Sequence, residues 1–172
     1  MMRLFIAINF EDAFVDALVS LQNSLQSAGA IGNFTKRENL HMTLAFIGDY
    51  GNPEDVIEVM EDAQFRALDI RLEGVQQFRE MYFARISENQ GLEGYVRRLR
   101  RALADYGIPF DKKRFSPHIT LIRKVSYLNG VPAVSDMPKI STRVESVSLM
   151  RSERGKNGML YTEIGNVGGI IQ

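Results

Sequence analysis

The chain has 172 residues, of which 45% are hydrophobic and 24% are charged, and its formal net charge is zero. This length suits one substantial core or two small lobes but not two ordinary domains, so we expect a single bilobal domain over residues 1–172. The balanced charge excludes a global field that would attract nucleic acid, so any polyanion must be held by a local patch. The absence of cysteine excludes disulfides, thiolate chemistry and cysteine-ligated metal sites.

The first part of the chain is predicted to begin with a strand that is followed by a helix. The apolar segment 1–10 is too short to span a membrane and fits a strand better than a signal peptide, so cytoplasm is the expected location. Apolar residues at helical spacing predict a helix over 11–28, which Gly29 can end. A second helix is predicted after Asn52, because Asn is a good N-cap and Pro53 suits the first turn.

The second part is predicted to contain two strands, a helix, a turn-rich segment and a final hairpin. Strands and helices then alternate without a glycine-rich nucleotide-binding turn after any strand. This order favours an α+β fold with antiparallel sheets over a doubly wound parallel sheet. The expected ranges are 69–86 with a turn near 77–80, 91–106, 126–138, 143–150 and 158–163.

One motif occurs twice in the same order and at the same spacing, and both histidines of the chain lie inside it. A complete supersecondary unit fits between the two copies, so the chain is predicted to consist of two related halves. The copies are Lys36-Arg37-x-x-x-His41-x-Thr43-Leu44 and Lys113-Arg114-x-x-x-His118-x-Thr120-Leu121.

Each copy of the motif lies in an apolar, β-prone run that predicts a strand. Side chains on a strand alternate between its two faces. His41 and Thr43 should therefore share one face, with Met42 and Leu44 on the other, and the second copy should follow the same pattern. A polar pair is expected to face outward from each strand.

Two histidines on opposite walls of a groove can act as base and acid in one turnover, because imidazole titrates near neutral pH. In-line displacement at phosphorus needs both, one to deprotonate the nucleophile and one to protonate the leaving oxygen. The threonine hydroxyls can donate hydrogen bonds to the charged phosphate oxygens. We therefore take His41, His118, Thr43 and Thr120 as candidate catalytic residues.

Positive charge near both motifs agrees with an anionic substrate. Arginine offers the planar fork that suits phosphate, so Arg123 and Arg114 are the first candidates for substrate binding. Phe34 is a candidate for stacking on a base, although packing at the rim of the core explains it equally well. The cations near the motifs are Lys36, Arg37, Lys112, Lys113, Arg114, Arg123 and Lys124.

These paired strands resemble the two-histidine phosphoesterase superfamily and, within it, the RNA 2′,3′-cyclic phosphodiesterase group, also called 2′-5′ RNA ligase-like. The resemblance covers nearly the full length of the chain. The chain departs from the family pattern at Asn33-Phe34, Lys36-Arg37 and Arg154, positions that bear on base stacking and substrate length. The matching segments are 3–8, 38–48 and 114–123, with Ser152, Gly158 and Tyr161 in the closing hairpin.

The resemblance implies two pseudo-symmetric antiparallel sheets with helices on the outside and a central groove. It implies metal-independent hydrolysis of a 2′,3′-cyclic phosphate at an RNA end to a 2′-phosphate, with His118 activating water and His41 protonating the 3′ oxygen. Weak, reversible 2′-5′ RNA ligation is a permitted side activity. On this interpretation the substrates are RNA ends or nucleotides, no cofactor or obligate protein partner is required, and a monomer is the default.

Several alternatives remain open from the sequence alone. A lone histidine in a strand is usually structural, and duplication is what favours a functional pair. A two-histidine metal site lacks a further ligand at recognisable spacing. A binding module could hold a nucleotide or RNA end in the same groove without turnover. The arginine-rich run 97–101 is best explained as the solvated face of a helix.

Overall fold

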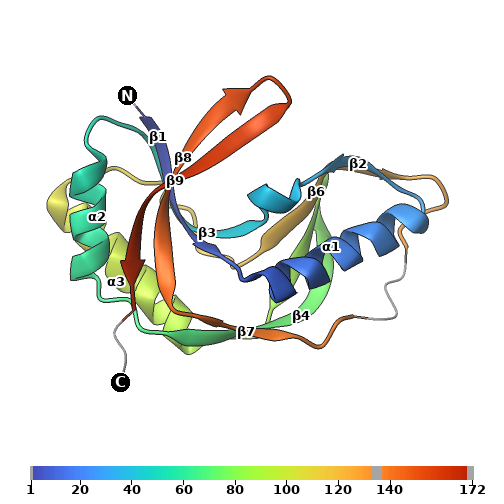
Figure 1. Cartoon of the computed structure of the whole chain (residues 1–172), viewed down its shortest axis with the longest axis horizontal. Helices are drawn as coiled ribbons and strands as arrows, with labels where there is room; N and C mark the ends of the chain where they lie inside the picture. Colours follow the sequence, from blue (N-terminus) through green and yellow to red (C-terminus); the bar gives the residue numbers. More distant parts are fainter. Residues whose placement is uncertain (1, 133–136, 170–172) are drawn as a thin grey trace.

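The computed structural model describes residues 2–132 and 137–169, which form two antiparallel sheets flanked by three α-helices (Figure 1). The first sheet has the strand order β3-β1-β8-β9 and the second β2-β6-β5-β4-β7. In chain order the elements are β1 (Met2–Asn9), α1 (Asp12–Ser27), β2 (Ala30–Phe34), β3 (His41–Tyr50), α2 (Pro53–Asp62), β4 (Leu68–Phe78), β5 (Met81–Ile86), α3 (Gln90–Tyr106), β6 (Ile119–Tyr127), β7 (Ser141–Val144), β8 (Ser146–Gly155) and β9 (Gly158–Gly168).

The helices form where the sequence supplies both an apolar stripe and local end signals. Asn52 begins α2 by accepting a hydrogen bond from the Glu54 N–H at 3.2 Å, and Asn89 begins α3 by accepting from the Leu92 N–H at 2.9 Å. Gly107 ends α3 in the left-handed conformation, with a φ of 80°. The predicted ranges 11–28 and 91–106 agree with α1 and α3 to within one residue, and α2 begins directly after Asn52 as predicted.

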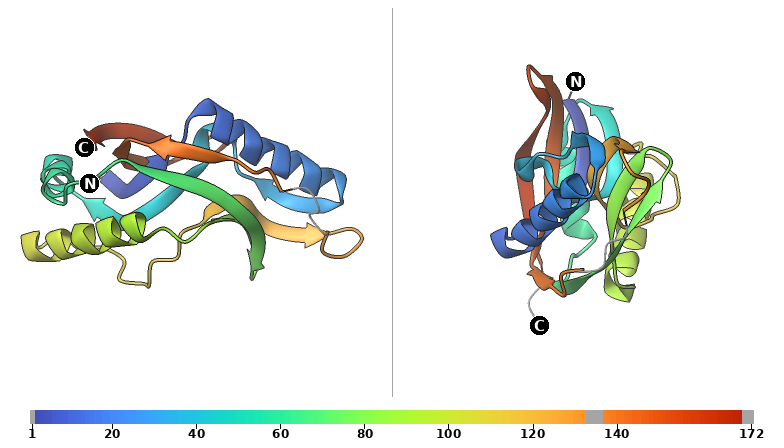
Figure 2. Two further views of the ribbon diagram at one scale, coloured as in Figure 1. Left: turned by 90° about the horizontal axis from the view of Figure 1, so that it is seen from below. Right: turned by 90° about the vertical axis from the view of Figure 1, so that its right-hand side faces the viewer.

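Helices α1 and α3 each follow a strand of one sheet and contact a strand of the other sheet. Helix α1 follows β1 of the first sheet but contacts β2 and β6 of the second. Helix α3 follows β5 of the second sheet but contacts β3 of the first sheet and α2. Figure 2 shows α1 at one end of the molecule and α2 with α3 at the other. These helix contacts connect the two sheets.

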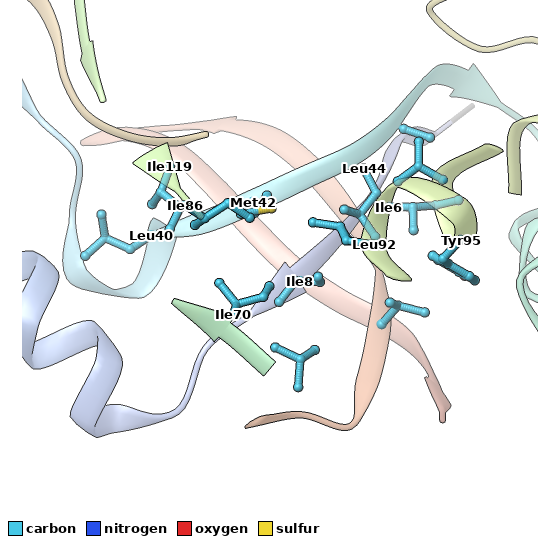
Figure 3. Packing of buried hydrophobic residues seen from close by; sticks show 14 of the residues in the cluster. Ile6, Ile8, Leu40, Met42, Leu44, Ile70, Ile86, Leu92, Tyr95 and Ile119 are labelled. Atoms are coloured by element: carbon cyan, nitrogen blue, oxygen red, sulfur yellow. The ribbon is translucent and has the colours of Figure 1, made fainter. Parts of the chain in front are cut away.

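The main hydrophobic cluster takes residues from both sheets (Figure 3). Ile6 and Met42 come from the first sheet, Ile86 and Ile119 from the second, and Leu92 from α3, all with at most 7% of their surface exposed. Full burial of an aliphatic side chain stabilises a fold by roughly 1.5–3 kcal/mol. The shared cluster supports a single bilobal domain, which stays a prediction.

The structure corrects three details of the sequence interpretation. The predicted strand 143–150 is two strands, because β7 pairs with β4 of the second sheet and β8 pairs with β1 of the first, so the chain changes sheets between them. Strand β2 was not predicted. The predicted turn-rich segment 126–138 begins inside β6, and residues 133–136 of it lie outside the described residues.

The predicted α+β class, with two antiparallel sheets and external helices, is confirmed. No helix within residues 2–132 and 137–169 has both the length and the apolar character that crossing a bilayer requires.

Candidate active site

The two motif strands contact each other where the two sheets meet. His41 is the first residue of β3, and His118 directly precedes β6. The four apolar motif residues Met42, Leu44, Ile119 and Leu121 are at most 1% exposed, whereas both histidines and both threonines keep part of their surface accessible. The alternation expected from the sequence is therefore observed in both copies, and the polar pairs face away from the core.

Both imidazoles are anchored in the same way, by the backbone carbonyl two residues earlier. His41 Nδ1 lies 2.6 Å from the Asn39 oxygen, and His118 Nδ1 lies 2.7 Å from the Ser116 oxygen. Because a carbonyl only accepts, each Nδ1 must carry the proton and donate it. In the neutral ring Nε2 is then unprotonated and able to accept a proton.

The two threonines have different partners. The Thr43 hydroxyl lies 3.0 Å from His41 Nε2, which accepts its hydrogen bond when the ring is neutral. The Thr120 hydroxyl instead donates to the Met81 thioether sulfur at 3.3 Å. A thioether is a weak acceptor, so a phosphate oxygen can replace it at little cost.

His41 lies in an aromatic enclosure formed by two strands of the first sheet. Its ring centre is 5.1 Å from that of Phe5 and 5.2 Å from that of Tyr161, which meets it edge-on. His118 has one such neighbour, Phe83, at 5.3 Å. The first copy of the motif is therefore more tightly enclosed by aromatic rings than the second.

This enclosure changes the acidity of His41. Burial lowers the pKa of His41 below its ordinary value, because the protonated ring loses hydration. The Asn39 carbonyl opposes this effect, and the positive charges of Arg123 and His118 lower the pKa further. His41 is therefore biased toward the neutral form, and the effect of His118 on its pKa places the two imidazoles within electrostatic reach of each other.

Two cavities meet at His41. One has a volume of about 380 Å³ and reaches toward β1, β3 and the β8–β9 hairpin, and the other, of about 650 Å³, reaches toward β2. Both are lined by His41, Arg123, Met159 and Tyr161. The first also contains Arg3, Thr43, Ser152 and Arg154, and the second contains Phe34, Lys36, Asn39 and Thr120. The arrangement is a positively charged groove around the imidazole, which suits an anionic ligand.

The backbone of β2 holds Arg123 at the junction of these cavities. A Cβ on Gly32 would lie 2.7 Å from the Arg123 carbonyl oxygen and 2.8 Å from Ile122 Cγ2. Only glycine allows the two strands to approach this closely without displacing β6. Gly32 thus supports the position of Arg123.

The tip of the β8–β9 hairpin, which projects beyond the rest of its sheet (Figure 1), is fastened to the segment before His41. The Asn39 side chain donates to the Met159 carbonyl at 3.0 Å, and Lys36 Nζ donates to the Asn157 carbonyl at 2.5 Å. Asn39 thus holds the hairpin with its side chain and the His41 ring with its own carbonyl. These bonds keep Tyr161 against His41.

The candidate substrate-binding residues do not all lie in this groove. Arg123 lines both cavities, and Phe34 lines the larger one while packing against the edge of the core. Arg114 is exposed in the irregular segment before His118 and lines neither cavity. Arg37 points to α1, where it pairs with Asp16 at 2.7 Å. Only some of the cations that lie near the motifs in the sequence therefore line the groove.

Several groove residues were not selected from the sequence as site residues. Arg3 and Phe5 could have been found, because alternation along β1 places them on one face, away from the core residues Leu4 and Ile6. Tyr161 gave no signal beyond its place in the closing hairpin. Within residues 2–132 and 137–169, no group of three or more His, Asp or Glu side chains could hold a metal ion.

Two facing sheets that each contribute a His-x-Thr strand define the class of two-histidine phosphoesterases. Residues 12–156 match the family model described as the 2′-5′ RNA ligase superfamily. The chain belongs to this superfamily.

Two relatives agree with this placement, and a solved structure has the same fold. Proteins named RNA 2′,3′-cyclic phosphodiesterase from Methanothermobacter thermautotrophicus and Aeropyrum pernix are each 28% identical to the chain. The first match covers 94% of this chain and 96% of the relative, and the second 86% and 92%. The crystal structure of E. coli LigT complexed with 3′-AMP superposes with a TM-score of 0.81 over 98% of both chains at 23% identity, which shows a shared fold.

Proposed function

We propose that this protein is an RNA 2′,3′-cyclic phosphodiesterase that hydrolyses the cyclic phosphate to a 2′-phosphate by histidine acid-base catalysis without a metal. The observation that carries the proposal is the matched anchoring of the two histidines. Each Nδ1 donates to a carbonyl two residues earlier, so each Nε2 is kept for proton transfer. Curated relatives of nearly the same length with this name support the substrate class.

In the proposed reaction a water molecule attacks phosphorus on the side opposite the 3′ oxygen. His118 Nε2 takes a proton from the water as the new P–O bond forms. His41, protonated on Nε2, gives its proton to the 3′ oxygen as the P–O3′ bond breaks. The products are a 2′-phosphate and a free 3′-hydroxyl. The assignment of acid and base follows the family resemblance.

Thr43, Thr120 and Arg123 are proposed to stabilise the charge on the phosphate oxygens. When His41 carries a proton on Nε2, its ring no longer accepts from Thr43, and that hydroxyl is free to donate to phosphate. Thr120 exchanges the Met81 sulfur for a phosphate oxygen. Donors held in place before the reaction lower the barrier because they need no reorganisation.

The lowered pKa of His41 fits this scheme if its protonation is coupled to substrate binding. In the empty groove, burial and two nearby cations disfavour a proton on this ring. A bound phosphate anion reverses the local charge balance and raises the pKa of His41. Substrate binding therefore favours protonation of His41, the proposed general acid.

The remaining expectations form part of the same proposal. Phe34, in the larger cavity, is assigned to contact with a base, and Arg114 to contact with an RNA strand outside the cavities. We expect a cytoplasmic monomer without an obligate protein partner. Elution at the volume of a single 19.5 kDa chain would support the monomer, and elution at twice that mass would contradict it.

The test is incubation of the purified protein with a short RNA ending in a 2′,3′-cyclic phosphate, in EDTA, with chromatographic separation of 2′- and 3′-phosphate products. We expect conversion to the 2′-phosphate alone. The double variant His41→Ala/His118→Ala controls for contaminating enzymes. Tight binding of the RNA without product would indicate a binding module, and a 3′-phosphate product would contradict the proposed geometry of attack.

A further inference from the structure

A third cavity lies beside the groove, at the turn between β4 and β5. Its volume is about 330 Å³, and it shares Arg123 with both cavities at His41. It also contains Met81, whose sulfur accepts the hydrogen bond from Thr120. The cavity is therefore adjacent to Thr120, yet the proposed reaction at the terminal phosphate gives it no role. Its lining residues are Phe78, Arg79, Glu80, Met81, Arg123 and Lys124.

An irregularity in β6 directs two neighbouring cations into this cavity. Tyr82 pairs with Ile122, and the Val125 N–H donates to the Glu80 carbonyl at 2.9 Å, so Arg123 and Lys124 together lie opposite Met81 alone. Lys124 has a φ of 53°, in the left-handed region. In a regular strand consecutive side chains would point to opposite faces, whereas at this bulge both line the same cavity.

The β4–β5 turn places an aromatic ring and a third cation on the opposite side of the cavity. Phe78 is 57% exposed, and the Arg79 guanidinium lies 5.3 Å from the centre of its ring. Arg79 also has a left-handed backbone, with a φ of 54°. Gln77 fixes the turn, since its amide donates to the Arg79 carbonyl and its oxygen accepts from Tyr127, both at 2.8 Å.

The cavity combines left-handed backbone with an excess of positive charge. Left-handed backbone in a residue other than glycine costs of order 1 kcal/mol or more, and the cavity contains two such residues, Arg79 and Lys124. Three cations stand against one carboxylate, that of Glu80. An exposed ring with cations around it offers a stacking surface for a base and charge for a phosphodiester.

We propose that this cavity binds the nucleotide on the 5′ side of the cyclic-phosphate terminus. Its base stacks on Phe78, and the phosphodiester that links it to the terminal nucleotide contacts Lys124 and Arg79. The inference rests on the proposed function and narrows its substrate class, because only an oligonucleotide has a nucleotide on the 5′ side of the terminus. An RNA oligonucleotide is the preferred substrate.

The kinetic test compares kcat/KM for an adenosine tetranucleotide ending in a 2′,3′-cyclic phosphate with kcat/KM for adenosine 2′,3′-cyclic phosphate. We expect the wild type to prefer the tetranucleotide, and the ratio to fall roughly tenfold or more in Phe78→Ala, the scale of one lost stacking contact. Tyr106→Ala is the matched control, because Tyr106 is also exposed, at 47%, and lines none of the three cavities. A ratio in Phe78→Ala equal to that of the wild type would overturn the proposal.

A binding measurement separates this inference from the proposed activity, since it needs no turnover. The probe is a fluorescent tetranucleotide ending in a 2′-phosphate, with adenosine 2′-monophosphate as the short ligand. Phe78→Ala should weaken binding of the tetranucleotide but not of the monophosphate. Lys124→Ala should reduce the magnitude of the slope of log K against log salt by about 0.7. Arg101→Ala, on the exposed face of α3, should leave this slope unchanged.

Equal weakening of both ligands by Phe78→Ala would mean that the cavity holds the terminal nucleoside, and the proposal would fail. If Phe78→Ala weakens only tetranucleotide binding and the wild type hydrolyses neither substrate, the subsite is supported and the proposed activity is rejected.

Discussion

The two copies of the motif share their backbone arrangement but differ in what surrounds each imidazole. Both rings donate Nδ1–H to a carbonyl two residues earlier. His41, however, is enclosed by Phe5 and Tyr161 and linked to Thr43. Within residues 2–132 and 137–169, His118 has one aromatic ring beside it, that of Phe83, and the Thr120 hydroxyl donates to Met81 instead of bonding to His118. A repeated sequence thus provides equal geometry, and the neighbouring strands make the two histidines chemically unequal. In the proposed mechanism, His41 as the acid therefore depends on the bound phosphate to favour its protonated form.

The largest effect is expected when each histidine is removed separately. His41→Ala and His118→Ala should each lower kcat on the cyclic-phosphate RNA by about 10²- to 10⁴-fold, because each deletes one proton transfer. Circular dichroism and thermal unfolding would verify that the variants remain folded. Near-normal turnover in either variant would remove that histidine from the proposed mechanism.

The threonines give the next largest effect. Thr43→Ala and Thr120→Ala should each lower kcat by roughly 10- to 100-fold, since a hydrogen bond to a charged group contributes about 1.5–3 kcal/mol. Thr43→Ser and Thr120→Ser keep the hydroxyl and should retain most of the activity. Only Thr43→Ala should also change the titration of His41, because only Thr43 contacts its own histidine. A similar change in Thr120→Ala would show that this distinction is wrong.

Gly32 lies against β6, the strand of the second copy, and approaches it most closely at Arg123. Gly32→Ala should destabilise the fold by about 1–3 kcal/mol and reduce kcat/KM, because the new methyl group displaces β6 at Arg123. Gly51→Ala is the matched control, since a Cβ there meets no atom within 4 Å. Denaturant unfolding measures the first effect and steady-state kinetics the second. Equal behaviour of the two variants would mean that β6 tolerates the shift.

The smallest expected effect is a shift in the pKa of His41. Burial penalises the protonated ring, so NMR should show His41 accepting its proton at a lower pH than an ordinary histidine, and nucleoside 2′-monophosphate should raise that pH. As the general acid His41 must be protonated, so kcat/KM should fall as the pH rises through its free-enzyme pKa, and kcat should fall only at higher pH. Identical profiles would contradict the coupling of protonation to binding.

The same pKa has a consequence for stability. A histidine with a lowered pKa binds fewer protons in the folded state than in the unfolded state. The contribution of His41 to folding is therefore fully present above its ordinary value, about 6.5, and decreases as the pH falls below it. His41→Gln should remove this dependence, which unfolding curves across the acidic range would detect.

The sequence predicted those features that local chemistry controls. Period-two alternation placed the motif threonines on the accessible face and Met42 and Ile119 in the core. Caps and apolar spacing gave the helices. Strand β2 was missed because it is short and contains Gly32, and its stability comes from pairing with β6, a partner distant in the sequence. The change of sheet between β7 and β8 was missed because a single residue, Glu145, separates the two strands, so no turn signal marks the boundary.

The paired histidines, the strand faces they share with the threonines and the antiparallel α+β class could all be predicted from local patterns. Which cations reach the groove depends on packing between distant segments, since β2 holds Arg123 there while Arg114 lies outside the cavities. The unequal enclosure of the histidines has the same origin, because Phe5 and Tyr161 reach His41 from strands far away in the chain. Local patterns fix the direction of a side chain, whereas its neighbours depend on long-range pairing of strands.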